Sequence, residues 1–108
     1  MATSRSTIDY ILDQARGAGR LAGRKMFGEY ALYCDDKVVG LVCDDTLFVK
    51  ITEPGRKFVG EHYQEGFAYE GAKASMLIDG DRLENNEWLR DLVRITAANL
   101  PRPKPKKK

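Results

Sequence analysis

The sequence has very few of the side chains on which most enzymes and metal sites depend. Its 108 residues include one histidine, His62, and two cysteines, Cys34 and Cys43. It contains no glycine-framed serine and no phosphate-binding loop of the Walker type, which are common signatures of nucleophilic and nucleotide-dependent catalysis. We therefore expect a protein that is not an enzyme, needs no cofactor and takes no small-molecule substrate.

The sequence also gives little support to a metal site or a disulfide. With two-residue hairpin turns, Cys34 and Cys43 would not face each other, so we expect two small buried apolar groups. The pairs Asp35-Asp36 and Asp44-Asp45 could be taken as a carboxylate cluster, but they lie at predicted hairpin tips, where turn chemistry accounts for them. The single histidine falls in a different element, and no metal site is predicted.

Long apolar runs are missing as well. No run approaches the roughly 18 residues of a membrane-spanning helix, and the first residues, MATSRSTIDYI, lack the apolar middle of a signal peptide. The hydrophobic fraction of 43% and the charged fraction of 31% are typical of a soluble globular protein. The sequence predicts a cytoplasmic protein that does not interact with a membrane.

The central stretch, residues 25–51, predicts three short strands joined by two tight turns. It reads KMFGEYALYCDDKVVGLVCDDTLFVKI, with an aspartate pair at each turn. Aspartate tolerates the left-handed backbone that a tight hairpin needs, and two successive hairpins make an antiparallel meander. The middle segment, VVGLVC, lacks polar alternation and indicates a strand with some cover on both faces.

Helices and further strands are predicted on both sides of the meander. A first helix begins at Ser6 or Thr7 and ends near Gly17, and a final helix follows Asn85-Asn86 and ends at Pro101. A short helix is expected over residues 56–63, and two strand segments over 67–69 and 74–79. Residues 18–25, AGRLAGRK, are expected to form a solvated loop, with an anion or partner contact as the alternative.

This order predicts an α+β fold with two layers. An antiparallel sheet of about five strands (helix, three-strand meander, helix, two strands, helix) would carry its helices mainly on one face. Residues 1–100 would form one domain, and residues 101–108, PRPKPKKK, a disordered basic tail.

Three segments in this order resemble the N-terminal domain of the TfoX/Sxy family: RKMFGEYALY, then VVGLVCDDTLFVK, then YEGAK. The resemblance spans roughly residues 20–100. It implies the same α+β layout and a role in bacterial regulation, because full-length family members look like regulators that promote natural competence and act on transcription with the cyclic-AMP receptor protein. They typically carry a C-terminal helical domain, whereas this chain ends with the tail.

Two functions are favoured by these observations, and an enzyme with an unrecognised site ranks behind both. The first is a non-enzymatic regulatory or adaptor domain that works through protein contact, with a protein partner or as a homodimer. The second is an auxiliary nucleic-acid binder whose tail makes weak, salt-sensitive contacts with phosphates. The basic residues of the tail are Arg102, Lys104, Lys106, Lys107 and Lys108.

The charge distribution favours the first function. Five of the 18 basic residues lie in the tail, which leaves 13 basic and 16 acidic residues, a net charge of −3, in residues 1–100. An acidic body is a poor electrostatic match for nucleic acid. The local exception is the cluster Arg16, Arg20, Arg24 and Lys25. Lys73, within YEGAK, is the best isolated candidate for a specific polar role, although a plain surface lysine is the simpler interpretation.

The two faces of the meander suggest where a partner would bind. With two-residue turns, one face would carry Ala31, Tyr33, Val38, Gly40, Val42, Leu47, Val49 and Ile51. The other face would carry Tyr30, Leu32, Cys34, Val39, Leu41, Cys43, Thr46, Phe48 and Lys50. Both are largely apolar. Either the helices are divided between the two faces, or one face exposes an apolar patch for self-association or partner docking. We expect such a patch to be centred on Leu41 and Phe48, with Val39, Leu32 and Tyr30.

Overall fold

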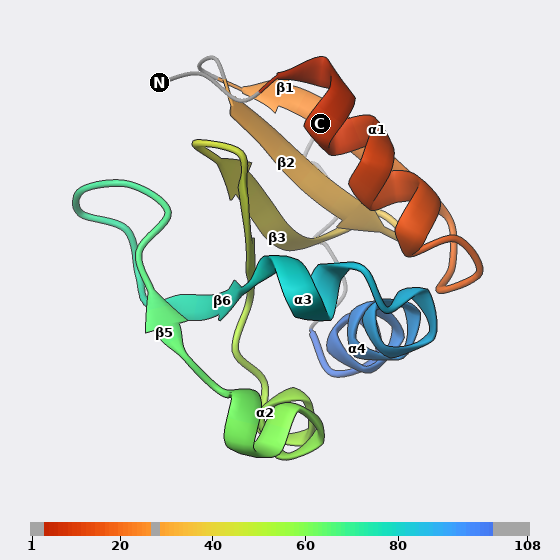
Figure 1. Cartoon of the computed structure of the whole chain (residues 1–108), viewed down its shortest axis with the longest axis vertical. Helices are drawn as coiled ribbons and strands as arrows, with labels where there is room; N and C mark the ends of the chain where they lie inside the picture. The colour runs from red at the N-terminus through yellow and green to blue at the C-terminus, as the bar shows by residue number, and fades with distance from the viewer. Residues whose placement is uncertain (1–3, 27–28, 101–108) are drawn as a thin grey trace, which may run out of the picture.

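The strands form one antiparallel sheet, and the helices pack against one of its faces (Figure 1). The computed structural model describes residues 4–26 and 29–100. Within these ranges the sheet has six strands in the order β1-β2-β3-β4-β6-β5. The predicted α+β class is confirmed, with one strand more than expected. The elements are α1 (Arg5–Gln14), β1 (Leu21–Met26), β2 (Glu29–Cys34), β3 (Lys37–Cys43), β4 (Thr46–Val49), α2 (Glu53–Val59), the 3-10 helix η1 (Gly60–His62), β5 (Glu65–Gly66), β6 (Ser75–Ile78), α3 (Gly80–Leu83) and α4 (Asn86–Ala98).

Both turns of the meander have the backbone that the aspartate pairs predict. All four aspartates, from Asp35-Asp36 and Asp44-Asp45, have positive φ angles between 53° and 68°, as the type I′ turn requires at its two central residues. The Asp45 carboxylate also accepts hydrogen bonds from the Ser4 amide (3.0 Å) and the Thr7 hydroxyl (2.8 Å). These bonds lower the pKa of Asp45 and connect the β3–β4 turn to the start of α1.

Residues 21–26 form a strand, so the loop predicted there is wrong. β1 pairs with β2 along its whole length and forms one edge of the sheet. Its glycine and two basic residues obscured the strand pattern in the sequence. Gly23 is needed at this place because a Cβ atom would lie 2.7 Å from Cγ1 of Ile8, so α1 can approach the sheet closely only over a glycine.

Two helices supply most of the cover of the sheet. α1 buries Ile8 and Ile11, and its cap is Ser4 rather than the predicted Ser6 or Thr7. α4 begins after the predicted cap Asn85 and buries an apolar stripe of Leu89, Leu92, Val93 and Ala97. At its other end, Nζ of Lys37 donates a 2.7 Å hydrogen bond to the Ala97 carbonyl. A cation is favourable at the carbonyl end of a helix dipole, so this bond helps to hold α4 against the first residue of β3.

A bulge in β3 divides the central sheet into two registers. Tyr33 pairs with Val38, but Leu32 pairs with Gly40, so Val39 is an extra residue on β3. Gly40 allows the close approach of β4 at this point, because a Cβ atom there would lie 2.4 Å from the carbonyl oxygen of Phe48. One extra residue moves the following side chains to the opposite face of the sheet.

The predicted division of the meander into two faces is therefore wrong beyond the bulge. Tyr30, Leu32, Cys34 and Val39 lie in the core beneath the helices, together with Val42, Leu47 and Val49. Leu41, Cys43 and Phe48 do not belong to that core cluster. The assumption of two-residue turns was correct, and the error arose because the predicted strands were regular and contained no bulge.

The C-terminal half differs from the prediction in its smaller elements. The predicted strand over residues 67–69 is wrong, since β5 ends at Gly66 and these residues begin a loop that leads to β6. α2 begins at Glu53, three residues before the predicted start, because Thr52 caps it through a 3.0 Å bond to the Gly55 amide. α3 was not predicted. No helix in the described residues is long and apolar enough to span a membrane.

The bulge yields a specific prediction about stability. Gly40→Ala should lower the free energy of unfolding by about 2 kcal/mol, because the new methyl group must displace the β4 backbone rather than a flexible side chain. Gly80→Ala is the matched control, since no atom lies within 4 Å of the place that its Cβ atom would take, and it should leave stability unchanged or slightly raised. Urea unfolding of the two variants measures the difference, and equal stabilities would contradict the role assigned to Gly40.

Candidate functional site

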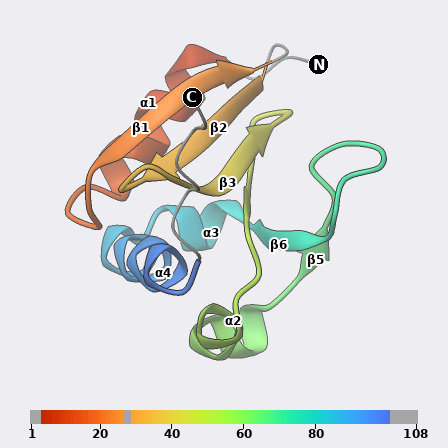
Figure 2. The same ribbon diagram turned by 180° about the vertical axis from the view of Figure 1, so that it is seen from behind.

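One face of the sheet carries no helix in the described residues, and we call it the outer face. Its central row crosses five strands in register: Arg24, Ala31, Leu41, Phe48 and Leu77. Figure 2, seen from behind, shows β1 and β2 in front of α1, the helix that packs on their other side. The prediction that the helices lie mainly on one face is confirmed, and the alternative of helices divided between the faces is wrong.

The structure separates the five residues predicted to bind a partner. Leu41 and Phe48 lie in the central row of the outer face. Leu32 and Val39 lie in the core under the helices, because the bulge reverses their relation to Leu41. Tyr30 belongs to the same core cluster, although it also lines a cavity beside Leu41. The interpretation of Leu32 and Val39 as part of a docking surface is therefore corrected.

Phe48 is covered by strands rather than by a helix. It is only 6% exposed, and its ring lies over β5: a Cβ atom on Gly66 would be 3.0 Å from Cε2 of Phe48. The same hypothetical atom would be 3.1 Å from Cδ1 of Leu77. Phe48 thus forms a small second core between β4 and the β5–β6 hairpin, whereas Leu41 beside it is half-buried.

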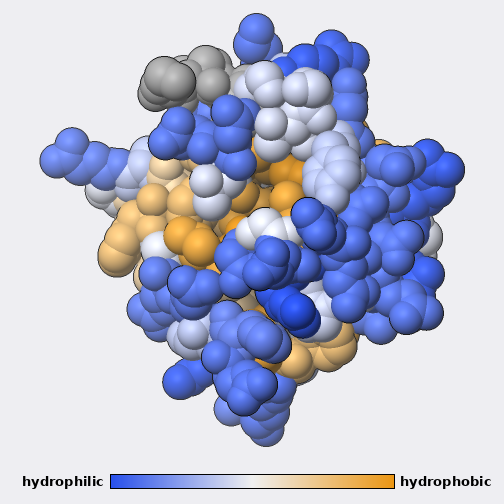
Figure 3. Space-filling model, in the orientation of Figure 1, coloured by the Kyte–Doolittle hydropathy of each residue, from blue (hydrophilic) through white to orange (hydrophobic). Residues whose placement is uncertain are grey.

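Two adjoining grooves cross the outer face beside the loop that joins β5 to β6. Each has a volume of about 500 Å³, and Leu41, Ala68 and Tyr69 line both. Two aromatic side chains of the loop are among the most exposed large apolar residues that the structure describes, Phe67 at 63% and Tyr69 at 58%. Figure 3 shows hydrophobic surface on the side of the molecule where this loop lies in Figure 1.

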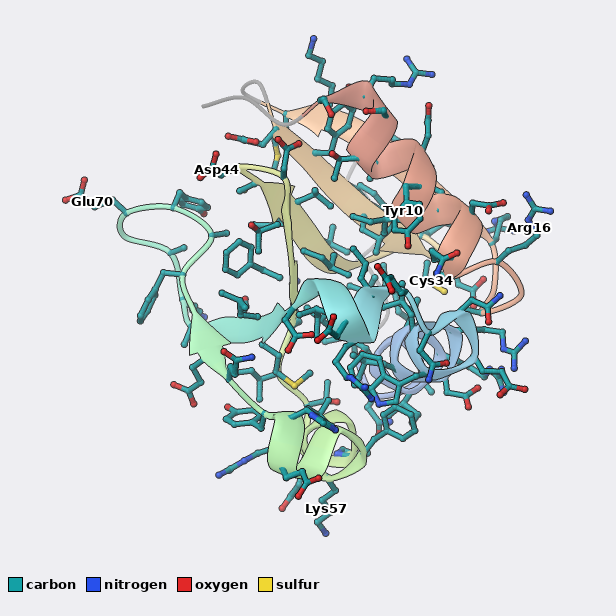
Figure 4. The ribbon with its side chains drawn as sticks, in the orientation of Figure 1. Tyr10, Arg16, Cys34, Asp44, Lys57 and Glu70 are labelled. Atoms are coloured by element: carbon teal, nitrogen blue, oxygen red, sulfur yellow. The ribbon has the colours of Figure 1, made fainter. Side chains whose placement is uncertain are left out.

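The two grooves differ in charge. Lys50 and Lys73 line the groove near the end of β4, and neither takes part in an ion pair among the described residues. Glu29 lines the other groove and accepts a 3.1 Å hydrogen bond from the Asp44 amide. Figure 4 shows Asp44 at the β3–β4 turn. The groove near the end of β4 is therefore basic and the groove near the β3–β4 turn is acidic, with the apolar side chain of Leu41 shared by both.

The cysteines show no sign of chemical activation. Burial raises the pKa of the Cys34 thiol, and burial followed by the charge of Glu29 raises the pKa of the Cys43 thiol. A raised pKa keeps a thiol protonated and therefore a poor nucleophile and metal ligand. No group of three His, Cys, Asp or Glu residues in the described part of the chain is placed to hold a metal ion.

The basic cluster near the N-terminus is largely engaged within the protein. Arg16 pairs with Asp13, and Arg20 pairs with Asp36 at 2.8 Å. Arg24 stacks over the ring of Tyr33, 5.2 Å from its centroid. The tail residues proposed to bind nucleic acid lie outside the described residues: Arg102, Lys104, Lys106, Lys107 and Lys108.

The loop residues beside the grooves were not recognised in the sequence as part of a binding surface. In Phe67, Ala68 and Tyr69, large and small apolar side chains alternate. This alternation is typical of a strand and led to the wrong prediction of a strand there. The neighbouring Gly66 and Gly71 were the available signal for a loop, and two exposed aromatics in a loop are a more specific indication of binding than two in a strand.

Comparison with known proteins agrees with the fold and the motifs. A family model described as the TfoX N-terminal domain matches residues 13–100. The chain is also similar to an uncharacterised 12.7 kDa protein from the trpE 5′ region of Spirochaeta aurantia, with 46% identity over 107 residues, 99% of this chain and 91% of the relative. The family resemblance predicted from the three sequence segments is confirmed.

Substitutions at Phe48 and Tyr69 should distinguish buried from exposed apolar residues on this face. Phe48→Ala should lower the free energy of unfolding by about 3 kcal/mol, because it empties the space between β4 and β5. Tyr69→Ala should change it by less than about 0.5 kcal/mol, as is usual for an exposed position. Urea unfolding measures both. A large loss of stability in Tyr69→Ala would show that Tyr69 supports the fold rather than a binding surface.

Proposed function

Since this chain belongs to the TfoX N-terminal domain family, we propose that it is a non-enzymatic regulatory or adaptor domain that acts by binding another protein. The outer face is the proposed contact surface. The single observation that supports this most strongly is the pair of exposed aromatics, Phe67 and Tyr69, beside grooves that no helix of the described chain covers. Exposed aromatic side chains around an apolar depression are typical of protein contact sites.

The chemistry of the surface also favours protein over a small substrate. The two grooves adjoin each other and share Leu41, Ala68 and Tyr69, so they form one extended surface, whereas a small-molecule site is usually a single cleft or cavity with convergent polar groups. The two lysines at one end, Lys50 and Lys73, can orient a partner through charge without supplying catalysis. A role in competence and transcription, which the family resemblance implies, is part of this proposal.

Cross-linking in cells tests the contact surface directly. An amine-reactive cross-linker, followed by mass spectrometry, should place intermolecular links at Lys50 and Lys73, which line the outer face. Lys57 is the internal control because it belongs to α2, on the helix side of the sheet, and points into solvent in Figure 4. Links to other proteins that concentrate several-fold at Lys57, or are spread evenly over the lysines, would contradict the proposal.

Nucleic-acid binding by the tail is the second candidate function. It is favoured by one observation: five positive charges and no acidic residue within residues 101–108. The engagement of Arg16 and Arg20 in ion pairs gives little support to an extension of this surface onto the folded domain.

A salt titration tests the tail. If the tail binds DNA, the affinity for a mixed-sequence duplex should fall as the salt concentration rises, with a log–log slope of about −4.5, as expected for roughly five neutralised phosphates. The matched control replaces the five basic residues of the tail with glutamine and keeps its prolines. Binding that is equal in both proteins, or no binding at about 50 mM salt, would eliminate this function.

A further inference from the structure

The outer face has a charge pattern that is complementary to itself. Register places Glu29 beside Cys43, because Tyr30 pairs with Val42, and Cys43 in turn pairs with Thr46 at the start of β4. Lys50 follows the other end of β4, and its amide donates to the Val39 carbonyl. The acidic and basic ends are thus separated by about 13 Å along β4, four residues at the rise of a strand.

The middle of the same face has a complementary shape as well. Tyr69 protrudes, with 58% of its surface exposed, and lies between two grooves that Leu41 also lines. One molecule therefore offers both a projecting aromatic ring and an apolar groove. A two-fold axis brings the same patch of both molecules together. If residue i of the first molecule contacts residue j of the second, then residue j of the first also contacts residue i of the second.

We propose that the outer face binds a second copy of this chain. The two copies are related by a two-fold axis near Leu41, so that Lys50 and Lys73 of each copy face Glu29 and Asp44 of the other, and each Tyr69 enters a groove of its neighbour. This inference rests on the proposed function of the outer face as a protein contact surface and names its occupant. Binding of a different protein would not require opposite charges at the two ends of this face.

Charge reversal at one end should weaken the dimer, and reversal at both ends in different molecules should restore it. Lys50→Glu combined with Lys73→Glu makes both ends of the face acidic. Glu29→Lys combined with Asp44→Asn makes both ends basic, because Asp44 would otherwise neutralise the new lysine. Each variant alone should be monomeric at a concentration at which the wild-type protein is a dimer. In an equimolar mixture, every acidic end of one variant meets a basic end of the other, so a heterodimer should form.

Sedimentation velocity of the full chain measures these states. Wild-type protein should sediment as a dimer whose dissociation constant rises with salt, and each reversal should weaken it by about tenfold or more, since several pairs repeat across the axis. Lys57→Glu, on the helix side of the sheet, is the control and should leave the dimer unchanged. Thermal unfolding of every variant checks that the fold is retained.

Glu29 also accepts a bond from the Asp44 amide, so Glu29→Lys could unfold the hairpin. Glu29→Gln then replaces it, because glutamine keeps an acceptor at this place while removing the charge, and it should weaken the dimer without unfolding the protein. A wild-type monomer at all concentrations, a dimer unaffected by the lysine reversals, or a mixture that stays monomeric would overturn the proposal. In that case, outer-face cross-links to a different protein in cells would still support the proposed function as a protein contact surface. Absence of such cross-links would contradict both the dimer and the proposed function.

Discussion

The close approach of β4 to Gly40 is the constraint on which the arrangement of both sheet faces depends. No side chain fits at this position, because the carbonyl of Phe48 occupies the place of a Cβ atom. Val39 and Val42 are separated by an odd number of positions, so in a regular strand they would lie on opposite faces. Because Val39 is an extra residue in β3, both belong to the core under the helices. The same shift turns Leu41 and Cys43 outward. A regular β3 would have put Leu41 on the helix side and Val42 on the outer face, so the bulge decides which apolar side chains each face carries.

The sequence was informative where a local chemical rule decides the structure. The aspartate pairs predicted both tight turns, and Asn85 with its apolar stripe predicted α4, because turns and caps depend on a few neighbouring residues. The bulge could not be predicted, since Gly40 in a strand has several interpretations and the deciding contact is with Phe48, on the next strand. β1 was missed for a related reason: its pattern of small and basic residues is stabilised by pairing with β2, and not by burial of its own side chains.

The position of β1 also explains why basic residues accumulate near the N-terminus. A strand at the edge of a sheet presents unpaired backbone groups, and charged side chains on such strands discourage pairing with other molecules. Arg24 and Lys25 lie on this edge, and both are exposed. Arg16 and Arg20 form solvent-exposed ion pairs with Asp13 and Asp36. The positions of these basic residues are therefore explained locally, without phosphate recognition.

The outer face is connected to the rest of the domain through Phe48. Its ring packs against Gly66 and Leu77, so the β5–β6 hairpin is positioned by a contact made on the side of the sheet opposite the helices. This hairpin carries Phe67 and Tyr69 at its loop, and a loop supported at its base by a buried aromatic can present exposed aromatics in a fixed place. Preorganisation of this kind reduces the entropy lost on binding. Phe48 therefore contributes to the position of the exposed aromatics although it lies outside the main core.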